Sequence, residues 1–126
     1  MDHRGAIEFL FTWGRTGVLG DSRIAAVGHR VVHGGTRFSA PARLTADTIA
    51  ELETLTPLAP LHQPHNLAAI RSVSELAPAL PQVACFDTAF HRAQPEVAQA
   101  FALPRRYVRD GVRRYGFHGL SYEYIA

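Results

Sequence analysis

Three short strings of the sequence place Arg, Asp or His beside small residues, at the point where an apolar stretch ends. These strings are Gly28–Gly35, Phe86–His91 and Tyr115–Gly119, and two further histidines lie in a fourth string, Leu61–Asn66. In each string a rigid helix or strand can hold a polar side chain at its end. Guanidinium and imidazole groups donate hydrogen bonds to carboxylate and phosphoryl oxygens. The strings therefore predict an anion-binding site assembled from several segments.

Arg30 lies in an apolar strand pattern, directly before Val31 and Val32. A charged group in such a place is costly unless it is paired or bound to an anion. Two interpretations stay open: a buried ion pair with a carboxylate, or a fork that holds a carboxylate or phosphoryl group through two hydrogen bonds. The neighbouring His29 and His33 are interpreted as structural residues.

Asp87 directly follows the apolar run 82–86, and ligands of open α/β sheets lie at the carboxyl ends of strands. It is either a turn or helix-capping residue, or a group that orients a cation or handles a proton. His118 has glycines close by on both sides, Gly116 and Gly119, and these permit close approach of the backbone to a ligand. A satisfied core histidine is the other interpretation of His118.

The remaining histidines offer a weaker pattern. His62 and His65 have an i, i+3 spacing that occurs in zinc sites, but no third ligand stands at a recognised spacing. We therefore assign no metal ligand. A metal-dependent hydrolase that uses His62, His65, Asp87 and His91 is kept as an alternative function. The single Cys85, in an apolar run, is interpreted as a small buried side chain, which fits a reducing cytoplasm.

The composition bounds the function. The chain has 126 residues, of which 47% are hydrophobic and 19% charged, as expected for one globular domain. Its net charge of +2 is too small to indicate a nucleic-acid partner, and no stretch resembles a signal peptide or a membrane span. All 13 Lys or Arg residues of the sequence are Arg, and there is no Lys. Phosphate-binding loops and Schiff-base chemistry that need a lysine are therefore excluded for this chain.

The apolar spacing predicts helices over residues 2–17, from Thr45, and over 65–76, and buried strands over 24–33 and 82–86. We expect short turns in the Pro- and Arg-rich region 92–110 and the start of a helix at 119–126. This order predicts an α/β architecture with helices covering a sheet. Both ends of the sequence fall inside helical patterns, which leads us to expect a fragment of a larger protein.

The strings GHRVVHGG, APLHQPHN, FDTAFH and RRYGFHG, in this order and at these intervals, closely resemble the acetate kinase family. The resemblance covers the chain from about Asp2 to Ala126. It implies a single partial domain, residues 1–126, of the ribonuclease H-like type found in acetate and sugar kinases, Hsp70 and actin. It also implies transfer of a phosphoryl group between ATP and acetate or propionate, with Mg²⁺, in a cytoplasmic homodimer without nucleic-acid or membrane partners.

The same resemblance implies roles for individual residues on the acyl-substrate side of the cleft. The implied catalytic residues are Asp87 and His118, the latter stabilising the transition state. The implied substrate-binding residues surround the carboxylate and the acyl methyl group: Arg30, Val32, Leu61, His62 and Phe117. Where the family pattern continues with Thr-Ser-His after Gly119, this chain has Leu120-Ser121-Tyr122.

The family's N-terminal phosphate turn and its nucleotide-binding half match nothing in this sequence, so we expect the chain alone to be inactive. A catalytically silent carboxylate- or phosphate-binding remnant is the alternative function. For Arg30, Asp87 and His118 to share one cleft, with His62 near them, the two predicted strands must be parallel neighbours. A right-handed crossover through the intervening helices favours that topology.

Overall fold

A small mixed sheet organises the chain in the computed structural model, which describes residues 3–126, apart from the side chain of Val18. Strand β3 (Gln82–Phe86) is central in the three-stranded order β1-β3-β2. Strand β1 (Val27–Val31) pairs with β3 in parallel, and the two-residue β2 (Ala42–Arg43) pairs with it antiparallel. The parallel neighbours expected from the sequence are confirmed.

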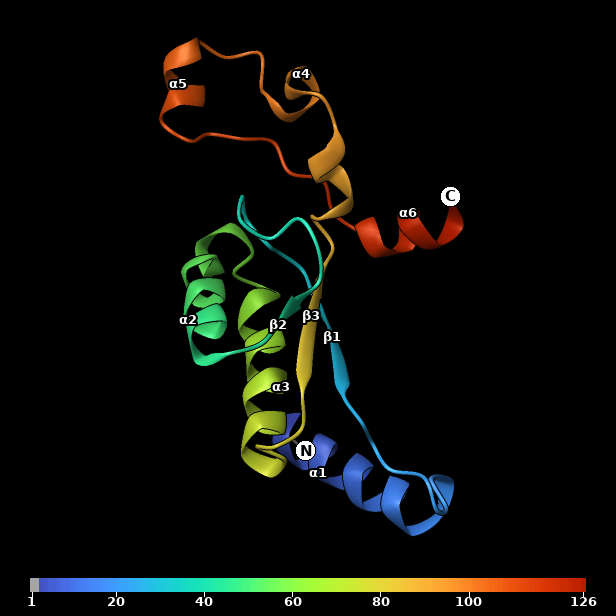
Figure 1. Cartoon of the computed structure of the whole chain (residues 1–126). Helices are drawn as coiled ribbons and strands as arrows, with labels where there is room; N and C mark the ends of the chain where they lie inside the picture. Colours follow the sequence, from blue (N-terminus) through green and yellow to red (C-terminus); the bar gives the residue numbers. More distant parts are fainter. Residues whose placement is uncertain (1–2) are drawn as a thin grey trace.

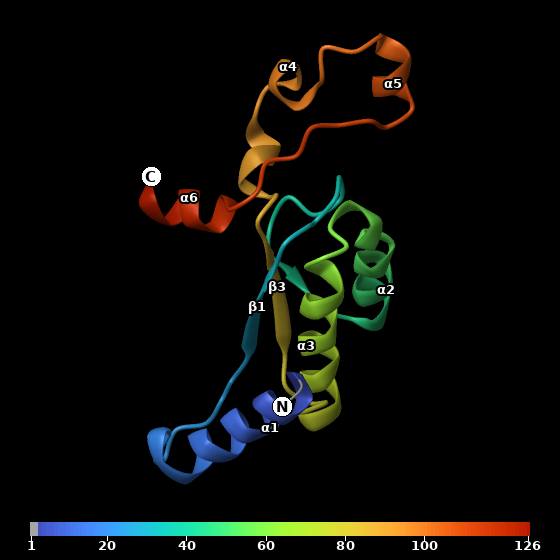
Figure 2. The ribbon, with the colours of Figure 1, turned by 180° about the vertical axis from the view of Figure 1, so that it is seen from behind.

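Two helices cover one face of this sheet. Figures 1 and 2 show α3 (Gln63–Leu76) against the strands and α2 (Ala46–Thr54) beside α3. The predicted cap is confirmed, because the Thr45 side chain accepts a hydrogen bond from the Thr48 amide. The core lies between these helices and the sheet, and its buried members are Val31, Leu52, Leu67, Ile70, Ala84 and Phe86.

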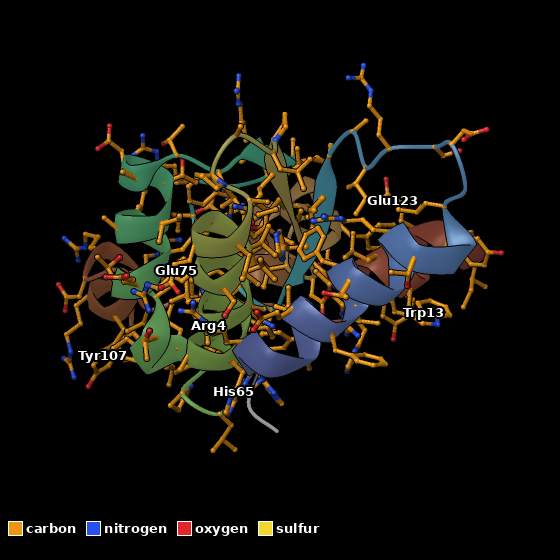
Figure 3. All side chains as sticks on the ribbon, turned by 90° about the horizontal axis from the view of Figure 1, so that it is seen from below. Arg4, Trp13, His65, Glu75, Tyr107 and Glu123 are labelled. Carbon is orange, nitrogen blue, oxygen red and sulfur yellow. The ribbon has the colours of Figure 1, made fainter. Side chains whose placement is uncertain are left out.

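Helix α1 (His3–Trp13) continues into a π-helical turn, Gly14–Val18, and crosses the lower end of α3. Arg4 forms an ion pair with Glu75 on α3, and Figure 3 shows this pair at one end of α1 and Trp13 toward the other. The predicted helix over 2–17 is thus confirmed from His3 onward, whereas its first residue lies outside the described part. No helix in residues 3–126 is long and apolar enough to cross a bilayer.

Three expectations need correction. The predicted strand 24–33 pairs only from Val27, whose amide donates to the Pro81 carbonyl, and Ile24 is exposed. Helix α3 begins two residues before the predicted start, since Pro64 fits a first helical turn. Arg30 is not buried: its side chain is 60% exposed, because β1 is an edge strand and Arg30 alternates with the buried Val31.

After β3 the chain forms an arm and returns. Figure 1 shows this arm, with α4 (Glu96–Gln99) and α5 (Arg105–Arg109), extending beyond the carboxyl ends of β1 and β3. The predicted short turns of region 92–110 are these helices and part of a 3-10 turn, Phe90–Ala93. The arm ends at α6 (Gly119–Ile125), where the Gly119 amide donates to the Asp87 carbonyl at 2.9 Å.

Candidate functional site

The carboxyl ends of β1 and β3 bring Arg30 and Asp87 together. Arg30 is level with Cys85 in the parallel register, and the Asp87 amide donates to the Val31 carbonyl at 3.0 Å. The guanidinium grips the carboxylate at two points, with Nε–Oδ1 at 2.9 Å and Nη2–Oδ2 at 2.8 Å. This bidentate geometry combines strength with a fixed orientation.

Burial is unequal across this ion pair. The Asp87 side chain is 2% exposed, whereas that of Arg30 is 60% exposed. A hydrogen bond from Arg30 to Asp87 and the negative charge of Asp87 raise the pKa of Arg30 above its ordinary value, so the guanidinium stays cationic. The buried carboxylate therefore acts as a fixed anchor for an exposed cation. The Nη1 donors of Arg30 make no hydrogen bond within residues 3–126, which leaves them for a ligand.

His118, on the segment that returns from the arm, contacts Arg30 of this ion pair. Its Nδ1 lies 3.3 Å from Arg30 Nη2, and because a guanidinium only donates, Nδ1 must be the acceptor. The neutral ring then carries its proton on Nε2. His118 has φ 57°, in the left-handed region, and is the one non-glycine residue with positive φ in the described chain. A Cβ at Gly119 would lie 2.2 Å from the Asp87 carbonyl oxygen, so this close approach requires glycine.

A cavity of about 490 Å³ opens at this junction. Its lining comes from the ends of β1 and β3, the turn before α3, the first turn of α3 and the returning arm: Arg30, Val32, Leu58, Ala59, His62, Asn66, Asp87, Phe117 and His118. The sequence-predicted site residues are thus brought together, with one exception. Leu61 is 78% exposed and does not line the cavity, because the turn before α3 directs His62 to it instead.

Asn66 is a lining residue that the sequence interpretation missed. Its Oδ1 accepts a hydrogen bond from the Val32 amide at 3.0 Å, one residue beyond the last pair of β1. The amide side chain therefore holds the end of β1 against the first turn of α3. Asn66 ends the quoted string of residues 61–66, and its polar side chain so early in an amphipathic helix was the available signal. Leu58 and Ala59 carried no comparable signal.

The two histidines interpreted as structural do make structural contacts. His33 is 1% exposed, its Nδ1 accepts from the Gly35 amide, and its ring packs edge-on against Tyr115 and Phe117. Burial lowers the pKa of His33 below its ordinary value. Burial also lowers the pKa of His29, against the opposing effect of its hydrogen bond to Gln82. His33 thus packs against Phe117, a residue of the cavity lining.

The donor set at the cavity is poor in metal ligands. Asp87 is the one carboxylate in the lining, and both of its oxygens accept from Arg30. In residues 3–126 no three His, Cys, Asp or Glu side chains are grouped closely enough to hold a metal ion. His65 stacks on His3, and His91 contacts the Phe117 carbonyl. The hydrolase alternative required these histidines to converge with Asp87, so the geometry contradicts it.

Comparisons with known proteins show the family of this chain. The sequence profile described as the Acetokinase family matches residues 1–126. The chain is 58% identical to the acetate kinase of Rhodopseudomonas palustris over 124 residues, which cover 98% of the chain and 31% of that relative. It is 54% identical to the acetate kinase of Methylocella silvestris over 123 residues, 98% of the chain and 30% of the relative. The chain thus spans about a third of these relatives' length.

Solved structures give the same result for the fold. An acetate kinase from Porphyromonas gingivalis matches with a TM-score of 0.83 and 41% identity, over 96% of this chain and 32% of that one. A propionate kinase from Francisella tularensis matches with a TM-score of 0.87 and 37% identity, over 97% and 32%. The expected partial ribonuclease H-like α/β fold is confirmed. With its whole length inside the family profile, this chain belongs to the acetokinase family.

Proposed function

We propose that the cavity is the carboxylate-binding part of a site that transfers a phosphoryl group between ATP and acetate or propionate, giving ADP and an acyl phosphate. One observation carries this proposal. Arg30, anchored by the buried Asp87 and touched by His118, stands beside the apolar side chains of Val32 and Phe117 in one cavity. A cation next to an apolar wall suits a small carboxylate with a methyl or ethyl group.

The residues of this chain would align and neutralise anions. A carboxylate substrate is ionised at pH 7 and needs no general base. Arg30 would donate to its oxygens or to the moving phosphoryl group, while Val32 and Phe117 receive the alkyl group. His118 would donate from Nε2 to a phosphoryl oxygen where charge develops. Asp87, which the family resemblance implies to be catalytic, would contribute by orienting Arg30. Positioning and charge stabilisation are the main catalytic terms in phosphoryl transfer.

ATP would supply the phosphoryl group, and Mg²⁺ would offset the charge of its phosphates. The lining does not fit a magnesium site by itself, because its one carboxylate is engaged by Arg30. We assign the ATP contacts, and most of those to Mg²⁺, to the regions of the roughly threefold longer relatives that the match does not cover. Family membership supports a cytoplasmic homodimer, without nucleic-acid or membrane partners, for the complete enzyme.

A chimeric kinase tests the proposal. These 126 residues would replace the matching third of the Rhodopseudomonas palustris enzyme, and acyl phosphate would be trapped as the hydroxamate. We expect ATP-dependent product from acetate or propionate, and its loss in the Arg30→Ala chimera but not in Arg105→Ala, which changes an exposed arginine of the arm. A folded chimera without activity would instead favour the alternative function, a catalytically silent carboxylate- or phosphate-binding remnant.

A further inference from the structure

His91 lies outside the cavity and contacts the segment that delivers Phe117 and His118 to it. The half-buried His91 belongs to the 3-10 turn Phe90–Ala93 that follows β3. Its Nε2 lies 2.8 Å from the Phe117 carbonyl oxygen. Because a carbonyl oxygen can only accept, Nε2 must carry the proton in this contact.

The His91 ring is fixed on several sides. A Cβ at Gly116 would lie 2.4 Å from His91 Cγ, so the Gly116 backbone rests directly against the imidazole. The Tyr122 ring meets His91 edge-on with centroids 5.7 Å apart, and Phe90 does so at 5.4 Å. A side chain packed in this way holds its hydrogen bond in one direction.

The backbone beyond Phe117 needs such support. His118 has the left-handed conformation, which side chains with a Cβ rarely adopt and which persists only where the surroundings determine it. The residue before it is held by His91 through the Phe117 carbonyl, and the residue after it by the Gly119 amide on the Asp87 carbonyl. Two hydrogen bonds therefore flank the strained residue.

We propose that His91 is a positioning residue of the cavity: its Nε2–H holds the Phe117 carbonyl and thereby places the Phe117 and His118 side chains beside Arg30. The inference rests on the proposed function in that it takes this cavity as the substrate site. His91 itself touches no substrate in this account. Its contribution is the geometry of the turn.

Nuclear magnetic resonance on the full chain, in solution or in the solid state, tests the proposal. Histidine nitrogen shifts, recorded at about pH 8 where imidazoles are neutral, report which ring nitrogen is protonated. We expect the Nε2–H form for both His91 and His118 in the unaltered chain. An Nδ1–H form of His91 would overturn the proposal without any variant.

Two variants separate the hydrogen bond from packing. His91→Leu removes the donor, so we expect both tautomers at His118 and about tenfold faster exchange of the Gly119 amide, the effect of one lost hydrogen bond. The Ile70 amide in α3 should keep its exchange rate. His91→Gln retains a donor near the Nε2 position and should restore both readouts. His3→Leu, at an exposed histidine of α1, is the matched control.

Unchanged readouts at His118 and Gly119 in His91→Leu, or equal changes in the Leu and Gln variants, would overturn the proposal. If His91→Leu fails to fold, the unaltered chain and His91→Gln still decide it. Acetate titration of the unaltered chain is a separate readout. If the chain shows no binding of acetate, the proposed function is contradicted. The tautomers and exchange rates still decide the role of His91 in that case.

Discussion

An exposed guanidinium held by a buried carboxylate is the central contact of this molecule. From sequence, Arg30 was expected to be paired or to bind an anion, and the structure shows an arrangement that permits both. That Asp87 is the partner of Arg30 could not be identified from sequence, because it depends on the register of the two strands. This register pairs Arg30 with Cys85, two residues before Asp87. Asn66 was not identified as a lining residue for the same reason, because its hydrogen-bond partner is a backbone amide on another element.

Removing the guanidinium should destabilise the fold. Arg30→Ala leaves the Asp87 carboxylate buried without its partner, at a cost of about 1–3 kcal/mol in the free energy of unfolding. Urea unfolding of the chain measures this change. The double variant Arg30→Ala/Asp87→Asn should recover part of the loss, because the buried charge is gone. Equal stability of Arg30→Ala and the exposed control Arg105→Ala would contradict the pairing as an energetic contact.

Buried histidine makes stability depend on pH. Burial lowers the pKa of folded His33 from its ordinary value of 6.5, so below that pH the unfolded chain binds the proton more readily than the folded chain. Stability is therefore full above about pH 6.5 and falls as the pH is lowered, and His29 acts in the same direction. Urea unfolding at several pH values measures the slope. His33→Asn keeps an acceptor for the Gly35 amide and should flatten it; a slope unchanged in that variant would refute the assignment.

Among the elements, those with strong local signals were predicted well. Strand β3 has the predicted bounds 82–86, and Thr45 caps α2 as expected. The predicted strand 24–33 was too long, because an apolar run pairs only where a neighbour exists, and β3 reaches no further than the partner of Val27. The two residues of β2 are too short for any alternation to be visible. Leu61 does not line the cavity for a related reason, since it lies in a turn that the sequence pattern does not specify.

The junction between β3 and α6 should not tolerate a side chain at Gly119. Gly119→Ala places a Cβ 2.2 Å from the Asp87 carbonyl oxygen, so the backbone must shift, at a cost of about 1–3 kcal/mol in stability. Thermal unfolding measures the effect. Gly17→Ala is the matched control, because a Cβ there has nothing within 4 Å. If both variants melt at the same temperature, the close approach is not a constraint on the fold.

The whole molecule presents an unpaired edge and many exposed apolar side chains. Strand β1 is at the edge of the sheet formed by the described residues, and Phe9, Leu10 and Trp13 of α1 are all more than half exposed. Such edges and patches favour association between chains. We expect light scattering to give a mass above 13.8 kDa that rises with concentration. Gly28→Lys, which adds charge to the edge strand, should reduce this association. A concentration-independent monomer would contradict this expectation.

Four strings of the sequence carried the family resemblance, and most of the residues that it names line one cavity. Burial and strand register depend on contacts distant in sequence, so they could not be predicted in the same way. The most direct test of the central claim is titration of the labelled chain with acetate, followed by nuclear magnetic resonance. We predict saturable shifts at Val32, Phe117 and His118 that disappear in Arg30→Ala and persist in Arg105→Ala. No shifts at these residues, or shifts that survive Arg30→Ala, would contradict the claim that this cavity binds a carboxylate.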